Sequence, residues 1–285
     1  MSAGPGTVPE LLLARARRRP AAVAVRQWDD RLTYADLVAI AAELATTLTA
    51  GGAGPEVPVG LCMRRTPRLA AAVLGVLLTG ATCVPLDAEM PGPRLEDVLD
   101  GARVGLLVVD EARGGPAGRT GRRLVEVPPG AAAAHVPTSR ALPDGAAFML
   151  HTSGSTGRPK AVVITHRGVV AYLAAMAALT GAGEKDRFLG FASLSFDVSV
   201  EDLLLAPSVG GALQLVPEAD RGDPARLQRF AEAHGVSWGC LPVSLLPLLD
   251  PGRLPEWRVL LTGGEPPGPE QVERWTAGGR RFINC

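Results

Sequence analysis

Lysine is almost absent from this sequence of 285 residues. Only Lys160 and Lys185 occur, and arginine supplies the remaining 27 of the 29 basic residues. Glycine (34) and proline (25) are abundant, which indicates a GC-rich coding bias more than a functional demand. Against that bias, each retained lysine is a candidate functional residue.

The sequence also lacks an excess of either charge and has few aromatic residues. Basic and acidic residues number 29 each, so the formal net charge is zero, and aromatics make up 4%. Nucleic-acid binders depend on phosphate neutralisation, and single-strand binders add aromatic stacking platforms. We therefore expect no nucleic-acid partner.

Paired cysteine motifs and long apolar runs are missing as well. The four cysteines form no CxxC pair, which predicts four free, mostly buried thiols in a cytosolic protein. The longest apolar run, 69–78, is interrupted by Gly75 and is shorter than a membrane span. The N-terminal segment 1–20 does not resemble a signal peptide. These features predict a cytoplasmic protein without a membrane partner.

The apolar segments alternate between strand and helix patterns along most of the chain. Hydrophobic residues account for 47% of the sequence, enough for one large or two medium-sized units. Alternation of this kind predicts an α/β fold with layered, largely parallel sheets and flanking helices. The predicted helices cover 8–18, 33–51, 66–80, 93–100, 168–179, 199–205, 223–234, 244–249 and 269–276. The predicted strands cover 22–26, 57–63, 83–86, 105–109, 146–150, 161–165, 188–192, 212–216, 236–241, 259–261 and 282–285.

One segment breaks this alternation. Residues 111–145 are rich in Gly, Pro and Ala and show no sustained periodicity, which predicts a flexible connection. We therefore expect two α/β subdomains, residues 1–145 and residues 146–285. Thr66 followed by Pro67 is expected to cap the helix over 66–80.

The segment His151–Lys160, HTSGSTGRPK, is rich in hydroxyl and glycine residues and lies between two predicted strands. Its glycines allow close approach of the backbone to a polyphosphate, its hydroxyls and amides can donate hydrogen bonds, and Lys160 adds a positive charge. A solvated Ser/Thr/Gly hairpin would show the same composition. It is not a Walker A loop, because Arg158 and Pro159 separate Gly157 from Lys160.

The segment FMLHTSGSTGRPKAVVITHRGV (148–169) resembles the signature of adenylate-forming enzymes, specifically the adenylation domains of nonribosomal peptide synthetases. Four further segments resemble other motifs of that family: LTYADL (32–37), LLTGATCVPLDAEMPGPR (77–94), FDVSVED (196–202) and LLTGGEPP (260–267). One departure is Ala161, where the family usually has glycine. The resemblance implies the N-terminal core of such a domain, built from two similar subdomains.

In that family, ATP and an amino acid form an aminoacyl adenylate, and the acyl group then passes to the thiol of a carrier protein. The resemblance thus implies ATP and Mg²⁺ as cofactors and a peptidyl carrier protein as partner, with an MbtH-like protein as a further possible partner. It gives Thr152 and Lys160 catalytic roles. The β- and γ-phosphates would be held by Thr152, Ser153, Gly154, Ser155, Thr156, Gly157 and Lys160. The adenine would lie against Gly264, Glu265 and Pro266, with Asn284 near its amino edge.

Asp197 has two interpretations. An aspartate between apolar residues before a helix is a good N-cap. In the resembling family this position pairs with the substrate's α-ammonium, and a buried carboxylate calls for such a cation. The other implied pocket positions are Phe196, Val198, Glu201, Cys240, Leu261, Gly263 and Cys285.

Glu201 gives a hypothesis about the substrate. It follows Asp197 by four residues, so both lie on one helix face if the helix begins between them. Two carboxylates in one pocket favour a substrate with two cations, such as lysine or ornithine. The alternative is a solvent-facing glutamate on an amphipathic helix. Among the histidines, His166 is expected to brace a loop, and His135 and His234 are expected at the surface.

The chain ends at Cys285, where the resembling family continues into a Tyr-Gly-Pro-Thr-Glu segment that includes a Mg²⁺-linked acid. The resemblance thus covers about the first half of an adenylation domain, and we expect the chain alone to be inactive. It would be a piece of a longer protein or half of a split one, and its start near Met1 suggests a stand-alone or loading protein. Alternatives are an aryl- or acyl-acid adenylating ligase and a non-catalytic nucleotide-binding or interaction module.

Overall fold

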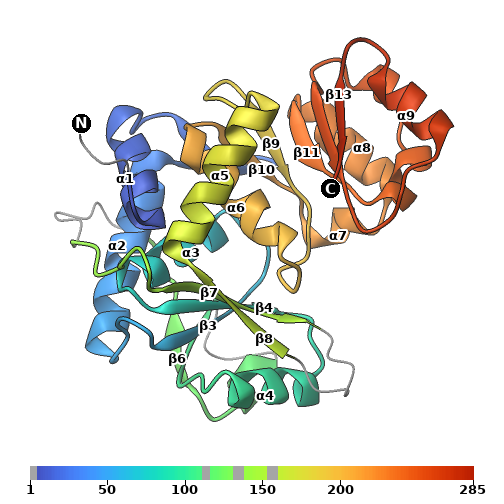
Figure 1. Cartoon of the computed structure of the whole chain (residues 1–285). Helices are drawn as coiled ribbons and strands as arrows, with labels where there is room; N and C mark the ends of the chain where they lie inside the picture. Colours follow the sequence, from blue (N-terminus) through green and yellow to red (C-terminus); the bar gives the residue numbers. More distant parts are fainter. Residues whose placement is uncertain (1–4, 111–115, 131–137, 153–159) are drawn as a thin grey trace.

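The computed structural model describes residues 5–110, 116–130, 138–152 and 160–285 as an α/β molecule with two sheets (Figure 1). The first sheet has six strands in the order β6-β5-β3-β4-β7-β8. Their bounds are Arg123–Glu126 (β6), Leu106–Val109 (β5), Pro58–Met63 (β3), Thr82–Asp87 (β4), Ala146–Thr152 (β7) and Lys160–Thr165 (β8).

The second sheet has seven strands in the order β13-β12-β11-β9-β10-β1-β2. Their bounds are Arg281–Asn284 (β13), Val259–Thr262 (β12), Trp238–Cys240 (β11), Arg187–Gly190 (β9), Ala212–Leu215 (β10), Val23–Gln27 (β1) and Asp30–Thr33 (β2). Within the described residues, only the β1–β2 and β7–β8 pairs are antiparallel. The predicted largely parallel α/β fold is confirmed.

Helices pack on these sheets close to the predicted positions. Most boundaries fall within two residues of the prediction, and the helix over 269–276 agrees at both ends. The α-helices are Val8–Arg18 (α1), Tyr34–Ala50 (α2), Arg68–Leu78 (α3), Gly92–Gly101 (α4), His166–Thr180 (α5), Val198–Val209 (α6), Glu218–Arg221 (α7), Pro224–Ala233 (α8) and Pro269–Thr276 (α9). The 3-10 helices are Pro116–Arg119 (η1), Val243–Leu248 (η2) and Pro251–Arg253 (η3).

The longest apolar run of the sequence forms α3, in the centre of the molecule. Every residue from Leu69 to Leu78 is buried, and the surrounding apolar cluster includes strands of both sheets. Gly75 permits close packing on α2, because a Cβ there would lie 2.9 Å from Leu44 Cδ2 and 3.1 Å from the Ala41 carbonyl oxygen. The interrupting glycine is thus a packing requirement.

Strands from both sides of residue 145 occur in each sheet. β7 and β8 complete the first sheet, and β1 and β2 pair onto β10 at the edge of the second. The expected division into 1–145 and 146–285 therefore does not follow the sheets, and as a division into subdomains it stays a prediction.

Three local predictions differ from the structure. The short strand β2 was not predicted, and β6 lies inside the segment expected to be a flexible connection, where it pairs with β5. Thr66 does not cap α3: the helix begins after Pro67 without a side-chain cap, and Thr66 Oγ1 is buried without a hydrogen-bond partner. None of the described helices is long and apolar enough to cross a membrane.

Candidate functional site

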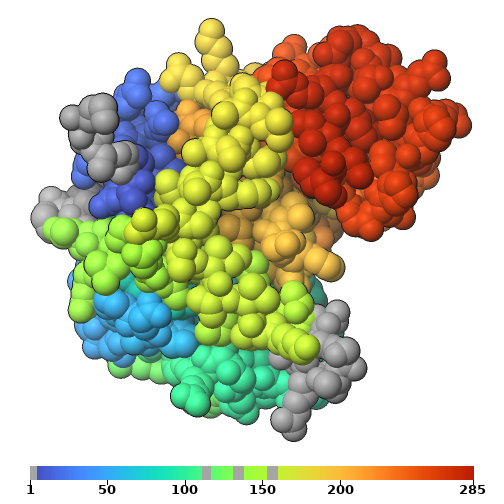
Figure 2. Space-filling view, in the orientation of Figure 1, coloured from blue at the N-terminus to red at the C-terminus, as the bar shows by residue number. Residues whose placement is uncertain are grey.

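The predicted pocket residues on the second sheet lie at the carboxyl ends of its strands and at the start of α6. β9, β11, β12 and β13 are parallel, and Cys240 on β11 aligns with Leu261 on β12. The carboxyl ends of such strands form the usual ligand crevice of open α/β sheets. In Figure 2 the surface is hollowed between the red C-terminal lobe and the yellow-green strand β8.

Asp197 occupies the N-cap of α6. Its Oδ1 accepts a hydrogen bond of 2.9 Å from the Val198 amide, and its side chain is exposed. The capping interpretation is therefore correct, and it engages only one carboxylate oxygen. Recognition of an ammonium by the second oxygen stays a prediction, and the neighbouring Phe196, which is 65% exposed, leaves this side of the helix open.

Glu201 does not point to solvent, as an ordinary helix-surface glutamate would. It is only 6% exposed, its Oε2 accepts a hydrogen bond from Tyr172 Oη on α5, and its Oε1 is buried without a partner. Burial raises the pKa of Glu201 to about 7, against the opposing effect of the tyrosine hydrogen bond, and the charges of Asp202 and Asp197 raise it further. Among the described residues, no cation pairs with this buried carboxyl group.

Two cysteines lie near this carboxyl group. Burial raises the pKa of the Cys240 thiol most, and the negative charges of Asp202 and Glu201 add to the effect. Burial and the charge of Glu201 likewise raise the pKa of Cys285. The mutual effects on the pKa values show that Glu201, Cys240 and Cys285 lie near one another, and their common pocket stays a prediction.

Two further pocket candidates, Leu261 and Gly263, lie on or just after β12 and differ in burial. Leu261 is 1% exposed and belongs to the central apolar cluster. Gly263 follows on the same strand end, where an added Cβ would lie 3.3 Å from the Cys285 carbonyl oxygen. Val198, in the first turn of α6, is half-buried.

Asp202 fixes the loop that leads into α6, and sequence reasoning missed it. It is 3% exposed, and its Oδ2 accepts hydrogen bonds from the amides of Phe191 (2.8 Å) and Ala192 (2.7 Å). Burial raises the pKa of Asp202 to about 6, while those two amides and the charges of Arg65 and Arg221 oppose the rise. The available signal was its position directly after Glu201 on an apolar helix.

Arg65 fixes the same loop from the other side and was also missed. Its guanidinium donates to the carbonyl oxygens of Gly190 (2.7 Å), Ala192 (2.6 Å) and Val216 (3.2 Å). It is 7% exposed, and burial lowers its pKa to about 10. Together Arg65 and Asp202 hold the loop that leads into α6, the helix with Asp197 at its N-cap and Glu201 in its first turn.

Thr152 is the last residue of β7, and Lys160 is the first residue of β8. They are register partners and both are exposed. The other predicted phosphate ligands, Ser153, Gly154, Ser155, Thr156 and Gly157, lie outside the described residues. The described ends place one hydroxyl and one ammonium opposite each other, which fits an anionic polyphosphate.

The predicted adenine-side residues follow β12 and β13. Gly264 has φ +86°, a left-handed conformation that favours glycine, and no atom lies within 4 Å of the position a Cβ would take. Glu265 and Pro266 are exposed next to it. Asn284 Oδ1 accepts a hydrogen bond of 2.9 Å from Thr262 Oγ1, which leaves its amide NH₂ group available to a ligand. This open, polar strand end fits a nucleotide base.

A metal centre is not evident in the described part of the chain. No group of three or more His, Cys, Asp or Glu side chains there could hold an ion. The predicted Mg²⁺ ligand was expected beyond Cys285. A Mg²⁺ site on these residues therefore has no support from the structure.

The remaining cysteine and histidine predictions have mixed outcomes. All four cysteines are free, as predicted, but only Cys62 and Cys83 are buried. His166 is buried and its Nδ1 accepts a 3.4 Å hydrogen bond from the Val8 amide, so it braces the start of α1 against α5. His234 is partly exposed at the end of α8, and His135 lies outside the described residues.

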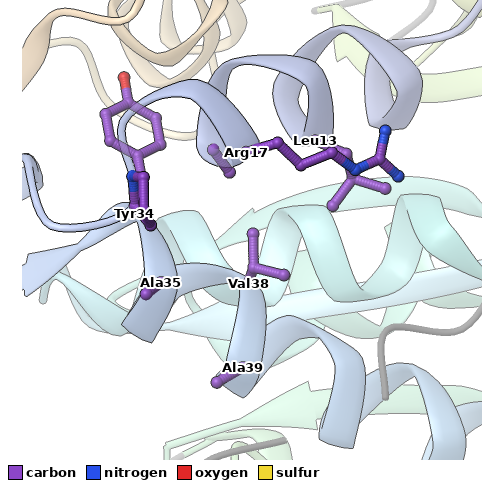
Figure 3. Close-up of a pocket in the computed structure, with 8 residues that line it drawn as sticks. Leu13, Arg17, Tyr34, Ala35, Val38 and Ala39 are labelled. Atoms are coloured by element: carbon purple, nitrogen blue, oxygen red, sulfur yellow. The ribbon is translucent and has the colours of Figure 1, made fainter. Parts of the chain in front are cut away.

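A separate groove of about 270 Å³ lies between α1 and α2. Figure 3 shows Leu13 and Arg17 of α1 above Ala35, Val38 and Ala39 of α2, with the ring of Tyr34 beside Arg17. None of the predicted site residues lines it.

Comparison with known proteins identifies the family. The model of the AMP-binding enzyme family matches residues 12–285. The chain belongs to this family, and it corresponds to the N-terminal subdomain of a nonribosomal peptide synthetase adenylation domain. It is 34% identical over 284 residues to nonribosomal peptide synthetase ecdA of Aspergillus rugulosus and 32% identical over 291 residues to nonribosomal peptide synthetase inpB of Emericella nidulans.

These alignments cover 96% of the chain but only 4% of ecdA and 12% of inpB, so the chain spans a small part of the curated relatives that it matches. Solved structures of related proteins have the same fold. The N-terminal subdomain of Klebsiella oxytoca NpsA is similar with a TM-score of 0.84 and 25% identity, over 98% of this chain and 74% of that one. The AMPPNP-bound form of the synthetase FmoA3 (S1046A) is similar with a TM-score of 0.85 and 25% identity, over 100% of this chain and 32% of that one.

Proposed function

We propose that this protein takes part in the ATP-dependent activation of a basic amino acid. In the proposed reaction the amino-acid carboxylate attacks the α-phosphorus of ATP, an aminoacyl adenylate forms and pyrophosphate leaves. A carrier-protein thiol then displaces AMP and retains the acyl group as a thioester. The observation that carries the choice of substrate is the buried, cation-free carboxyl group of Glu201.

Each residue has a distinct part in this proposal. Asp197 accepts the α-ammonium with the oxygen that does not cap α6. Glu201 accepts a second cation from the substrate side chain through Oε1, while Tyr172 holds Oε2. An ionised carboxylate buried without a cation is costly, so a substrate that supplies one gains affinity and relieves that cost.

The shape of the pocket residues supports a long side chain. Gly263 and Cys240 are small, and the half-buried thiol leaves room beside the carboxyl group. Leu261 is buried in the apolar cluster beneath this strand end and would support the pocket from the core side. Lysine, ornithine and β-amino or hydroxylated relatives have this combination of methylenes and a terminal cation.

The residues proposed to bind the phosphates of ATP lie on the β7–β8 hairpin. Thr152 and Lys160 would hold the β- and γ-phosphates and so stabilise the departing pyrophosphate. Gly264, Glu265, Pro266 and Asn284 would hold the adenine. A Mg²⁺ ion, a peptidyl carrier protein and an MbtH-like protein complete the proposal on the family resemblance alone.

An aryl-acid ligase is the second candidate, because one structural relative points to it. A structure of the Klebsiella oxytoca NpsA N-terminal subdomain, 26% identical, is in complex with 3-hydroxybenzoyl-AMSN. An FmoA3 structure contains α-methyl-L-serine-AMP instead. The likeness of the fold does not choose between these two substrate classes, whereas two carboxylates beside the pocket favour an amino acid with a basic side chain.

The decisive experiment is ATP–pyrophosphate exchange with the whole protein, comparing lysine and ornithine with leucine and with hydroxybenzoate. We expect exchange with the basic amino acids and none with the aryl acid. Glu201→Ala should cost about 3–5 kcal/mol toward a basic substrate, because it leaves a buried cation unpaired, and much less toward leucine. A preference for leucine or hydroxybenzoate by the unmodified protein would contradict the substrate assignment.

A further inference from the structure

Two arginines face each other across the β1–β2 hairpin without an acidic partner. Arg26 on β1 is the direct register partner of Arg31 on β2, so both side chains lie on one face of the sheet. Within the described residues, neither guanidinium makes a hydrogen bond or an ion pair. Like charges directly opposite each other destabilise a strand pair, so this arrangement calls for an anion.

The hairpin and the C-terminal end of α8 line an open cavity beside these arginines. Its volume is about 530 Å³, within the range of small-molecule sites, and Arg26, Trp28, Asp29, Arg31, Ala233 and His234 line it. The neighbouring acid Asp30 pairs with Gln27, one position further along each strand, and so lies on the opposite face. Asp29 is therefore the single acidic residue in the lining.

Trp28 is held in an unusual conformation at this cavity. It has φ +51° at the first central position of the two-residue turn, where glycine is favoured, so the tryptophan is retained at a cost in backbone strain. Its indole packs edge-on against Phe230 at 5.1 Å and donates a 3.1 Å hydrogen bond to Asp220 Oδ2. The ring remains 42% exposed and offers a flat apolar surface.

Polar groups without partners lie under the same surface. Arg26 Nε and His234 Nε2 are both buried and make no hydrogen bond. His234 lies 5.3 Å from the Trp28 ring, and burial and the charge of Arg26 lower its pKa. The nearby Asp220 is already engaged by Trp28 and by Arg226 at 3.7 Å.

We propose that this cavity is a binding site for a phosphomonoester, with the phosphate between Arg26 and Arg31. Guanidinium groups bind phosphate oxygens through paired hydrogen bonds, and a dianion removes the repulsion between the two arginines. The organic part of the ligand lies on the exposed face of Trp28. β1 and β2 lie at the opposite edge of the sheet from β13, so this site is distinct from the adenylation site and does not depend on the proposed function.

Calorimetric titration with ribose 5-phosphate tests the site, with ribose as the unphosphorylated control. The protein carries Lys160→Ala in all measurements, so that binding at the phosphate loop is suppressed. We expect ribose 5-phosphate to bind and ribose not to bind. Arg31→Gln should weaken binding roughly 10-fold or more, because a charge-assisted contact is lost. Arg18→Gln, at an exposed arginine of α1, is the matched control and should change nothing.

Histidine NMR locates the ligand. The ring resonances of His234 should shift on addition of ribose 5-phosphate, and those of His166 should not, because His166 is buried against α1. Thermal unfolding of Arg31→Gln without ligand should occur at or above the temperature of the parent, because the repulsion with Arg26 is removed, and this shows that the variant folds. Equal affinity of the parent and Arg31→Gln, or ligand binding without a response of His234, would overturn the proposal.

Discussion

Tyr172 on α5 donates a hydrogen bond to Glu201 on α6, and this contact between residues 29 positions apart joins the two helices beside the candidate pocket. The tyrosine is 47% exposed, whereas the glutamate is 6% exposed. The bond engages Oε2 and leaves Oε1 without a partner. Tyr172 therefore positions the carboxylate that we assign to the substrate, and it belongs with the pocket residues even though the sequence did not indicate it.

Tyr172→Phe should impair the use of a basic substrate. A hydrogen bond to a charged group contributes about 1.5–3 kcal/mol, so KM for lysine or ornithine should rise roughly 10- to 150-fold at pH 7. The loss should shrink as the pH increases, because the bond lowers the pKa of Glu201 and its removal raises that pKa further. Exchange kinetics from pH 6 to 9 measure both effects. A pH-independent loss would indicate a purely structural role.

The ionisation of Glu201 should also make the free energy of unfolding depend on pH. Its pKa is raised in the folded protein from 4.5 to about 7, so the folded state binds the proton more tightly than the unfolded state. The stabilisation that the protonated side chain gives the folded state is present in full below about pH 4.5 and is lost as the pH rises through about 7. Glu201→Gln should therefore stabilise the protein at pH 8 relative to pH 5, by on the order of 1–3 kcal/mol. Urea unfolding of both proteins at the two pH values measures this difference, and an equal effect at both would contradict it.

Lys160→Ala should weaken pyrophosphate handling more than amino-acid binding. The lysine is exposed at the start of β8, opposite Thr152, and would face phosphate oxygens. One charge-assisted contact corresponds to about 1.5–3 kcal/mol, or roughly 10- to 150-fold in pyrophosphate KM. Lys185→Ala, at the second lysine, is the matched control. Unchanged pyrophosphate exchange in Lys160→Ala would remove the lysine from the site.

Asp202→Ala should destabilise the fold, because it leaves the amides of Phe191 and Ala192 without their acceptor and removes the negative charge beside Arg65 and Arg221. We expect a loss of about 1–3 kcal/mol in the free energy of unfolding. Asp197→Asn is the matched control: it also caps a helix well and is exposed, so its effect should be below about 0.5 kcal/mol. Urea unfolding at pH 7 compares the two, and a larger loss in Asp197→Asn would refute the anchoring role of Asp202.

Local chemistry made the helices and strands predictable. The capping boxes at Thr7 and Thr33 begin α1 and α2, and the left-handed Gly181 ends α5, all through contacts within a few residues. β6 was not predicted, because its four residues become a strand only by pairing with β5. The same limit applies to β2, which pairs with β1 across a turn held by a tryptophan in a left-handed conformation.

The candidate pocket residues were implied by the family resemblance. The sequence by itself determined the α/β alternation and the hydroxyl- and glycine-rich segment between β7 and β8. These follow from periodicity, turn chemistry and motif spacing, which act over a few residues. Only the tertiary structure decided which carboxylates are buried, that Glu201 meets Tyr172 and keeps one free oxygen, and that each sheet mixes strands from both sides of residue 145. Burial and strand pairing depend on contacts between distant segments, and those contacts exist only once the helices and sheets have packed together.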